Sequence, residues 1–340
     1  MPLRDEDTTA YYFVNLENTI TRHFLDSLKQ TSSIALSAML LFVGLGLTGC
    51  TPKARFAPGE LRMNLGTEPP SLDWHITTDG TSGDVIVNIM AGLTQYQSDL
   101  KCVPSVAKSW EVLDGGRRYV FHLRDDVFWT DGKPVTAYDF EFAWRRLLAP
   151  ETAAQYAFFL YDIVGARAFN TGASKDVNTV GLKALDAYTF EVKLAKPAAY
   201  FIYLTAFCPS FPQRKDIVER FKDRWTEPEN LVTNGPFKLS RWQHEYKIEL
   251  EANEKFFEGA PKLKRIKMFM VPEASTAFAL YENNELDFVD NRSFSTPDVE
   301  RFRNSPEYKN FPLLRAYYLA FNVSKKPFDN ADVRRAFASV

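Results

Sequence analysis

Few side chains in this sequence could bind a metal or attack a substrate, and they are widely spaced. The histidines and cysteines are His23, His75, His122, His244, Cys50, Cys102 and Cys208. Zinc sites and redox cysteine pairs need such residues at short, fixed spacings, and none is found here. Glu285 and Asp287 come directly before an apolar, strand-like stretch, so we interpret them as a turn and not as a catalytic pair. Without a glycine-rich phosphate loop or a Gly-x-Ser-x-Gly elbow, the sequence predicts a protein that is not an enzyme and needs no metal or cofactor.

Cys50 is instead a candidate for acylation. It follows an apolar run, IALSAMLLFVGLGL (residues 34–47), that is shorter than the ~20 residues of a membrane-spanning helix. The ending Leu47-Thr48-Gly49-Cys50 resembles the lipobox of bacterial lipoproteins, in which cleavage exposes the cysteine for acylation. Each buried methylene contributes about 0.8 kcal/mol, so several chains on one residue hold a protein on a bilayer. We expect residues 34–50 to be a signal peptide with a lipobox; a buried helix that happens to end in cysteine is the alternative.

The segments on either side of this signal are expected to lie outside the fold. Residues 1–33 form a polar N-terminal extension with acidic residues such as Asp5 and Glu17, whereas a signal peptide normally begins with a short basic region. Residues 51–56 are predicted to be a tether, and folded sequence is expected to begin near Leu61.

Composition and charge describe a globular chain without a broad electrostatic field. Lys plus Arg (41) nearly cancels Asp plus Glu (43), and this balance disfavours a nucleic-acid partner. A length of 340 residues with 45% hydrophobic content is more natural for two lobes than for one. Aromatic residues make up 14%; they fill cores and also line clefts. The sequence leaves open whether Cys102 and Cys208 form a disulfide.

Strands and helices alternate along the body of the chain. Asp114-Gly115-Gly116 separates Trp110–Leu113 from the alternating run Arg118–Leu123, which indicates a hairpin. Thr136 and Asp139 have capping-box spacing, and apolar residues at helical spacing run from Phe140 to Leu148 before Pro150, which predicts a helix. Strict alternation returns at 188–194 and at 242–250, which predicts further strands.

The last residues suggest an element that has lost its support. Asn330 can cap a helix whose apolar positions Val333, Phe337 and Val340 continue to the final residue without a stop signal. Such a stripe needs a surface to pack on. We expect that the chain stops inside an element whose supporting domain is missing.

Several motifs together make the chain from Leu61 to Val340 similar to the periplasmic oligopeptide-binding proteins of ABC importers, in extracellular solute-binding protein family 5. They are Glu68-Pro-Pro-Ser-Leu-Asp73, Tyr119-Val-Phe-His-Leu-Arg124, Trp129-Thr-Asp-Gly-Lys-Pro-Val-Thr-Ala137, Gly181-Leu-Lys-Ala-Leu-Asp186, Trp225-Thr-Glu-Pro228 and Val232-Thr-Asn-Gly235. The last three resemble the oligopeptide branch in particular and favour a peptide over a metal ligand. The block Tyr317-Tyr318, Phe321-Asn322, Pro327-Phe328 and Val333-Arg334 is similar to the family's entry into its second large lobe.

The resemblance implies an α/β fold with periplasmic-binding-protein-like (type II) lobes and mixed sheets, the second large lobe being mostly missing. The first large lobe would comprise residues 57–91 plus 213–314, with a small lobe inserted at 92–212. Residues 315–340 would be the truncated start of the second large lobe. In this family the ligand lies between two large lobes that close by hinge motion.

The resemblance also suggests ligand-binding residues. Tyr156 falls where the oligopeptide receptors place a tyrosine against the bound peptide, and a core tyrosine is the alternative. Thr78, Asp79 and Gly80 lie in a loop that in those receptors offers a backbone edge and an acidic group near the start of the ligand. An ungapped match puts Thr78 on the acidic position and Asp79 one residue later, so the sequence departs from the pattern; a solvated turn aspartate is the alternative for Asp79.

Four further aromatic residues receive different expectations. Tyr317 and Tyr318 are predicted on the first strand of the second lobe, where alternation would point one of them into the cleft. Trp129 and Trp144 lie in fold-defining segments, and we expect both in the core.

The expected function is that of a monomeric substrate-binding lipoprotein, anchored through Cys50 on the periplasmic or extracytoplasmic side of the cell envelope. It would bind extended oligopeptides through their main chain and deliver them to an ABC permease in the inner membrane. A peptide-sensing lipoprotein is the alternative, and a secreted hydrolase is a weaker one because the sequence lacks a catalytic site.

Overall fold

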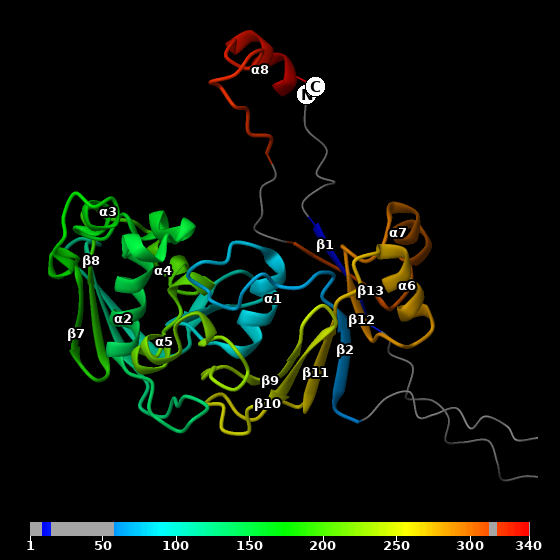
Figure 1. Cartoon of the computed structure of the whole chain (residues 1–340), viewed down its shortest axis with the longest axis horizontal. Coiled ribbons are helices and arrows are strands. Elements are labelled where there is room, and N and C mark those ends of the chain that lie inside the picture. The colour runs from blue at the N-terminus through cyan, green and yellow to red at the C-terminus, as the bar shows by residue number, and fades with distance from the viewer. Residues whose placement is uncertain (1–8, 15–57, 313–317, 340) are drawn as a thin grey trace, which may run out of the picture.

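The computed structural model describes residues 9–14, 58–312 and 318–339, and it has a mixed α/β architecture (Figure 1). A seven-stranded sheet has the order β13-β1-β12-β2-β11-β10-β9, a four-stranded sheet has the order β5-β6-β8-β7, and β3 pairs with β4. The predicted signal segment 34–50 and the tether 51–56 lie outside the described residues. Among the residues that are described, no helix has the length and apolar character needed to cross a bilayer.

The seven-stranded sheet combines a parallel centre with antiparallel flanks. Its strands are β1 (Thr9–Val14), β2 (Glu60–Asn64), β9 (Phe237–Gln243), β10 (Lys247–Ala252), β11 (Arg265–Phe269), β12 (Phe288–Asp290) and β13 (Tyr308–Pro312). β2 pairs in parallel with both β11 and β12, whereas β10 runs antiparallel to β11 and to β9. The carboxyl ends of the three parallel strands therefore meet at one edge of the sheet, which is where open α/β sheets bind ligands.

Strand β1 comes from the segment that we expected to lie outside the fold. It pairs antiparallel with β12 through Tyr12 and Asp290 and with β13 through Tyr11 and Asn310. The strands β12 and β13 each present an unpaired backbone edge toward this position, and an extended segment satisfies both edges. The expectation that all of residues 1–33 stay outside the fold was therefore wrong for Thr9–Val14.

The four-stranded sheet is entirely antiparallel, with two local hairpins joined by a long-range pairing that sets Arg118 opposite Lys193. It consists of β5 (Ala107–Leu113), β6 (Arg118–Leu123), β7 (Leu182–Asp186) and β8 (Thr189–Lys193), and the short hairpin β3 (Thr94–Tyr96) and β4 (Cys102–Pro104) lies nearby. The predicted hairpin is confirmed, since Leu113 pairs with Arg118 and the turn has positive φ at Asp114, Gly115 and Gly116.

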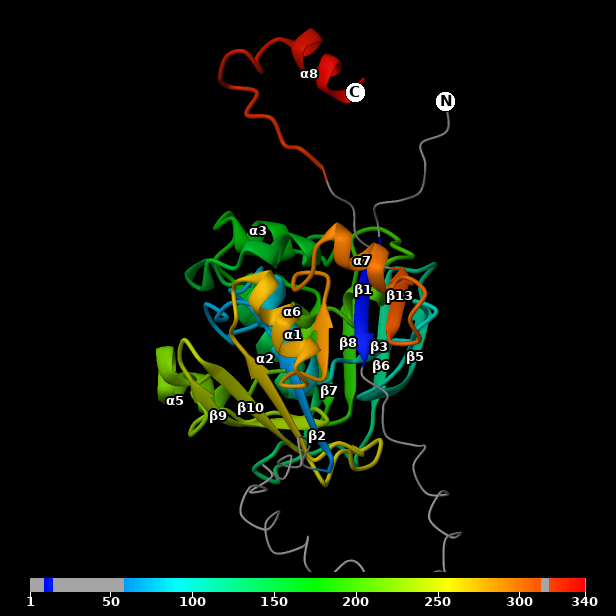
Figure 2. The ribbon, with the colours of Figure 1, turned by 90° about the vertical axis from the view of Figure 1, so that its right-hand side faces the viewer.

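The helices are short; most of them lie beside the sheets, whereas α8 stands apart from them in Figures 1 and 2. They are α1 (Gly80–Ile89), α2 (Ala137–Leu148), α3 (Ala166–Asn170), α4 (Phe201–Leu204), α5 (Lys215–Phe221), α6 (Ala274–Glu282), α7 (Thr296–Phe302) and α8 (Ala331–Ala338). Single 3₁₀ turns are η1 (Pro150–Thr152), η3 (Val177–Thr179), η4 (Cys208–Ser210) and η5 (Lys222–Arg224), and η2 (Gln155–Leu160) is a longer one.

Helix α2 confirms the helix that the sequence predicts. Thr136 caps it, and the Asp139 side chain accepts a hydrogen bond from the Thr136 backbone at 2.8 Å. Trp144 is fully buried and meets Phe190 of β8 edge-on, with 5.3 Å between the ring centroids. Its indole N–H donates to the Ser210 carbonyl. The core assignments of Trp144 and Trp129 are both correct.

The alternating run at 242–250 is not one strand. β9 ends at Gln243 and β10 begins at Lys247, with Tyr246 N donating to the Gln243 carbonyl and Glu245 at a φ of 60°. A tight turn can continue the alternation of two antiparallel strands, so the pattern alone does not reveal the reversal. The predicted C-terminal helix is confirmed as α8, capped by the Asn330 side chain.

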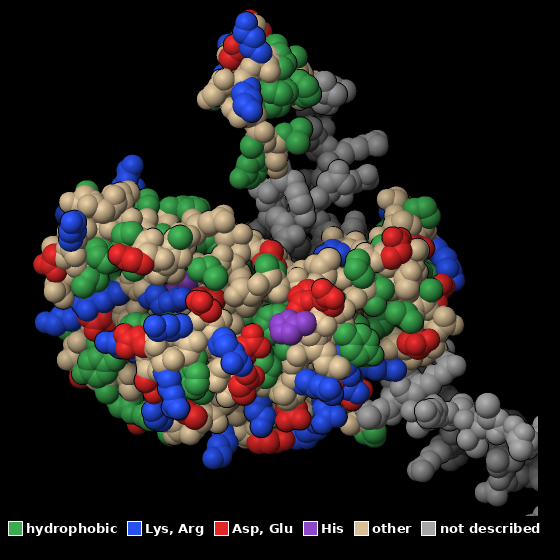
Figure 3. Space-filling model, in the orientation of Figure 1, with side chains coloured by type: hydrophobic (Ala, Val, Ile, Leu, Met, Phe, Trp, Pro, Cys, Tyr) green, Lys and Arg blue, Asp and Glu red, His purple; other side chains and the backbone are tan. Residues whose placement is uncertain are grey.

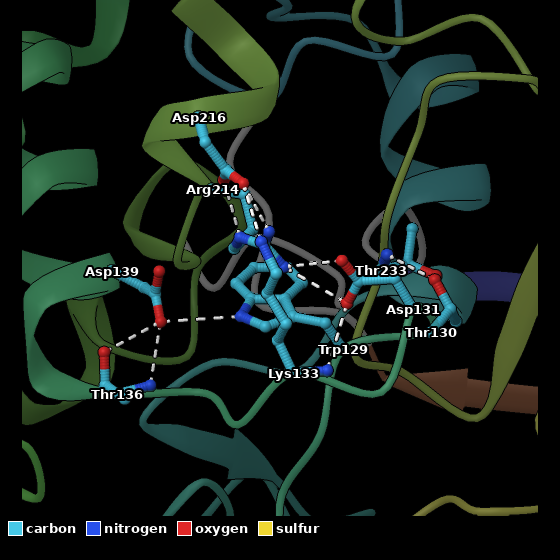
Figure 4. Close-up of polar contacts among 9 residues, drawn as sticks. All are labelled: Trp129, Thr130, Asp131, Lys133, Thr136, Asp139, Arg214, Asp216 and Thr233. Carbon is cyan, nitrogen blue, oxygen red and sulfur yellow. Dashed lines mark hydrogen bonds and ion pairs between the residues drawn. The ribbon is translucent and has the colours of Figure 1, made fainter.

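The loop before α2 is tied to the segment that leads into α5 by a buried arginine (Figure 4). Arg214, only 6% exposed, lies over the Trp129 ring at 5.9 Å from its centroid and donates to Asp131 at 3.0 Å and Asp216 at 2.6 Å. The Trp129 indole in turn donates to Asp139 of α2 at 3.4 Å. A charge this deeply buried needs such partners, so the Trp129 motif has a structural role.

Candidate ligand-binding site

The carboxyl edge of the large sheet is held together by one buried side chain. Asn64, at the end of β2, donates to the Val271 carbonyl and to Ser293 Oγ, both at 3.0 Å. Its side-chain oxygen accepts from Gly66 N at 3.0 Å and Val271 N at 3.1 Å. The loops that follow β2, β11 and β12 are therefore fixed to one another, which gives the edge a defined shape.

Glu68 connects the same edge to the β9–β10 turn. Its carboxylate accepts from Trp242 Nε1 at 3.0 Å and Glu245 N at 2.6 Å, and it contacts His244 Nδ1 at 2.6 Å. Figure 3 shows acidic side chains gathered beside a histidine, while Lys/Arg and Asp/Glu are otherwise interspersed over the viewed face. Glu68 therefore fixes the segment that follows β2 to the β9–β10 turn.

The loop between β2 and α1 is anchored on helix α2 by a buried ion pair. Asp73 accepts from Arg146 at 2.6 and 3.0 Å, and Trp225 Nε1 lies 3.4 Å from the same carboxylate. Burial alone raises the pKa of Asp73, but the hydrogen bond and charge of Arg146 outweigh it and lower the pKa. His75 is fully buried next to this pair, and burial lowers its pKa to about 3. The chain leaving this anchor leads directly to Thr78.

Two of the predicted ligand-binding residues meet in the structure. The Tyr156 hydroxyl donates to the Thr78 carbonyl at 3.2 Å, although the two residues are 78 positions apart. Tyr156 belongs to η2, whose Ala157 and Leu160 are buried, and its own ring is half-buried and outside the main core. This contact joins η2 to the loop that leads from the carboxyl edge into α1.

Asp79 serves as the cap of α1. Its carboxylate accepts from Ser82 N at 2.7 Å and from Ser82 Oγ at 2.8 Å. A capping carboxylate is held in place by the first turn of the helix, so this geometry favours the turn interpretation over a ligand contact. Gly80 begins α1 at an exposed position, and a Cβ there would meet nothing within 4 Å.

Of the remaining predicted functional residues, Tyr318 is the one in the part of the chain that the structure describes. Cys50 and Tyr317 lie outside the described residues. Tyr318 is 84% exposed and is not part of a strand, which differs from the expected first strand of a second lobe. Cys102 and Cys208 are both free thiols.

Two features near the site, an arginine and a pair of phenylalanines, were not predicted from the sequence. Arg292, after β12, donates to Asp84 of α1 at 2.6 Å and also pairs with Asp290, so it ties α1 to the sheet edge. Burial alone lowers the pKa of Arg292, but the two carboxylates raise it. Phe158 and Phe159 follow Tyr156 after Ala157, and both rings contact the Tyr156 ring. The sequence signal that could have identified Phe158 and Phe159 is the aromatic run beside Tyr156, which was already predicted to bind the ligand.

The histidines of the described chain have other partners than metals. His75 faces Arg146, His122 contacts Glu111 at 2.7 Å, and His244 contacts Glu68. In the part of the chain that the structure covers, no three His, Cys, Asp or Glu side chains group as metal ligands would.

Comparisons with known proteins point to one family. Residues 101–340 match the model of the family described as bacterial extracellular solute-binding proteins, family 5 Middle. The oligopeptide-binding protein OppA of Bacillus subtilis is 35% identical over 87% of this chain and 55% of its own length. A probable deoxycholate-binding periplasmic protein of Escherichia coli, YgiS, is 33% identical over 82% of this chain and 53% of its own length.

Solved structures agree with the sequence matches. Haemophilus influenzae OppA in complex with RPPGFSPFR is 31% identical, with a TM-score of 0.71 over 83% of this chain and 55% of that chain. The expected fold class, α/β with type II periplasmic-binding-protein lobes, is thereby confirmed. The chain spans about half the length of the curated relatives it matches.

Proposed function

The chain belongs to the bacterial extracellular solute-binding proteins of family 5, and on that premise we propose that it binds extended oligopeptides for a peptide ABC transporter. The family is defined by solute binding and not by catalysis. The proposed ligand is held mainly through its main chain, because backbone hydrogen bonds are available from peptides of any sequence.

The contact between Thr78 and Tyr156 is the observation that supports this proposal most. It brings together the two segments that family resemblance marks for peptide contact, one of which is the loop that leads from the end of β2 into α1. Thr78 and Gly80 are exposed there, and the Tyr156 ring is half-buried, so backbone and aromatic groups are accessible to a ligand.

The cellular setting forms the rest of the proposal. Cys50 would be acylated after signal-peptide cleavage and would hold a monomeric protein at the periplasmic or extracytoplasmic face of the membrane. An ABC permease would receive the peptide. A peptide-sensing role would use the same ligand site with a different membrane partner.

Relatives of this chain with nearly equal identity carry names for different ligands. OppA of Bacillus subtilis is named for oligopeptides, whereas YgiS is named as a probable deoxycholate-binding protein. A bile-acid-like ligand is therefore the second candidate, and a binding test needs both classes.

Calorimetric titration of the purified chain with a tripeptide pool and, separately, with deoxycholate tests the proposal. We expect heat of binding with peptides only, and recovery of uncleaved peptides by mass spectrometry. Tyr156→Ala should weaken peptide binding several-fold, whereas Tyr138→Ala, at a 55% exposed position on α2, should not. Binding of deoxycholate alone would replace the peptide proposal, and cleaved peptides would favour a hydrolase.

A further inference from the structure

Four aromatic rings form a cluster beside Thr78 that is separate from the hydrophobic core. The aromatic cluster consists of Tyr156, Phe158, Phe159 and Phe207. The Tyr156 centroid lies 5.3 Å from that of Phe159 and 5.4 Å from that of Phe207. The Phe158 and Phe159 centroids are 4.3 Å apart, and Phe159 meets Phe207 at 5.4 Å. None of the four belongs to the buried core or to the side chains packed against it.

The aromatic cluster is open to solvent. Phe158 is 53% exposed, and Tyr156, Phe159 and Phe207 are all partly exposed. Burying a large apolar ring is among the most favourable steps of folding, so a ring left outside the core forgoes that stabilisation. A contiguous exposed apolar surface on a soluble domain commonly marks a contact site.

The geometry of the aromatic cluster is also fixed before any ligand arrives. The Tyr156 hydroxyl is bound to the Thr78 carbonyl, and η2 is anchored by buried Ala157 and Leu160. Rings that are already ordered lose little conformational entropy when a ligand packs on them. A preorganised aromatic surface therefore favours selection by shape and apolarity.

The acidic side chain that follows Thr78 in the sequence is already engaged. Asp79 is the acidic side chain next to Thr78, and its carboxylate is engaged by Ser82. The rings offer faces and edges that pack well against another aromatic or a branched aliphatic group. A charged ligand side chain placed here would lose hydration without gaining a partner from Asp79.

We propose that the aromatic cluster is a side-chain subsite that selects peptides with an aromatic or large aliphatic residue beside the Thr78–Tyr156 contact. This inference rests on the proposed peptide-binding function and adds a preference to it. The occupant is one side chain of the ligand, because the cluster is continuous with the backbone segment proposed to meet the peptide and spans only a few ring contacts.

Saturation-transfer difference NMR on the full 340-residue chain tests the subsite with Ala-Phe-Ala, Ala-Ser-Ala, N-acetyl-phenylalanine amide and N-acetyl-serine amide. We expect Ala-Phe-Ala to bind roughly three- to tenfold more tightly than Ala-Ser-Ala, which corresponds to about 0.7–1.4 kcal/mol. Phe158→Ser should bring this ratio close to one, and Phe158→Tyr should retain it. The control Tyr138→Ser removes an equally exposed ring on α2 and should leave the ratio unchanged.

The outcomes separate the subsite from the function on which it rests. A phenylalanine preference that survives Phe158→Ser, or no preference in the native chain, overturns the subsite while leaving peptide binding in place. Binding of N-acetyl-phenylalanine amide that Phe158→Ser abolishes, without binding of either tripeptide, supports the subsite and refutes the peptide receptor. If neither phenylalanine probe binds the native chain, the subsite is refuted.

Discussion

The buried His75 should make the protein lose stability as the pH falls from 6.5 toward 5. His75 is fully buried, and burial lowers its pKa from 6.5 to about 3. Arg146 donates to His75 Nδ1 at 3.1 Å, so the proton of the neutral ring is on Nε2. Nε2 is buried and has no hydrogen-bond partner among the described residues, and the neighbouring Arg146 opposes a second positive charge.

The sign and size of the effect follow from proton linkage. Between pH 6.5 and 3 the unfolded chain protonates His75 while the folded chain does not, so the unfolded state binds more protons and the free energy of unfolding falls with falling pH. Each pH unit in this window contributes up to about 1.4 kcal/mol, or roughly 2 kcal/mol between pH 6.5 and 5. Asp73, whose pKa is lowered, adds to the loss only below its unfolded value of about 3.8.

Urea unfolding at pH 7, 6.5, 6, 5.5 and 5 measures this slope, with His75→Asn and the surface control His122→Asn compared with the native chain. His75→Asn is expected to be less stable at pH 7 because it disturbs the pair of Asp73 and Arg146. Its stability should nevertheless change little between pH 6.5 and 5, whereas His122→Asn should retain the native slope. Parallel curves for the native chain and His75→Asn would refute the assignment of the pH dependence to His75.

Three further expectations concern single residues. Asp79→Ala should lower the free energy of unfolding by about 1 kcal/mol, because it removes the cap of α1. Asp79→Asn should retain most of the stability that the cap provides. Equal losses for the two variants in urea titrations would contradict a capping role. Gly235→Ala should destabilise the chain by about 1–3 kcal/mol, because the added Cβ would lie 2.3 Å from the Ile89 carbonyl carbon. The control Gly83→Ala, whose Cβ would meet open space, should be tolerated. Thermal unfolding followed by circular dichroism measures both variants. Cys50→Ser should leave the chain unprocessed or release it from the membrane fraction, and normal maturation with membrane retention would argue against the lipid anchor.

Local patterns predicted local structure well in this chain. The β5–β6 hairpin and helix α2 both follow from signals within a few residues, namely a glycine turn and a capping box. Helix α8 was predicted from its Asn330 cap and apolar spacing. In each case neighbouring residues supply the hydrogen bonds that define the element, so the sequence contains most of the information.

Features that depend on distant partners were harder to predict. The alternation at 242–250 continues through a turn, because side-chain period alone does not specify chain direction. The pairing of β1 between β12 and β13 could not be read from residues 9–14 alone. The candidate site was predicted residue by residue from family resemblance, but the hydrogen bond between Tyr156 and Thr78 and the capping role of Asp79 required coordinates.

The central position of β2 has a consequence for the order in which the chain can fold during synthesis. The Asn64 side chain bonds to Val271, 207 residues later, and β2 pairs with β11 and β12. The four-stranded sheet, by contrast, is complete once β8 has been made. Closing a long loop costs entropy before its contacts form, so the inserted sheet should fold first and β2 should wait for its partners. A ribosome stalled near residue 250, with β8 clear of the exit tunnel and β11 not yet made, would therefore display a protease-resistant insert joined to an unpaired, protease-sensitive β2.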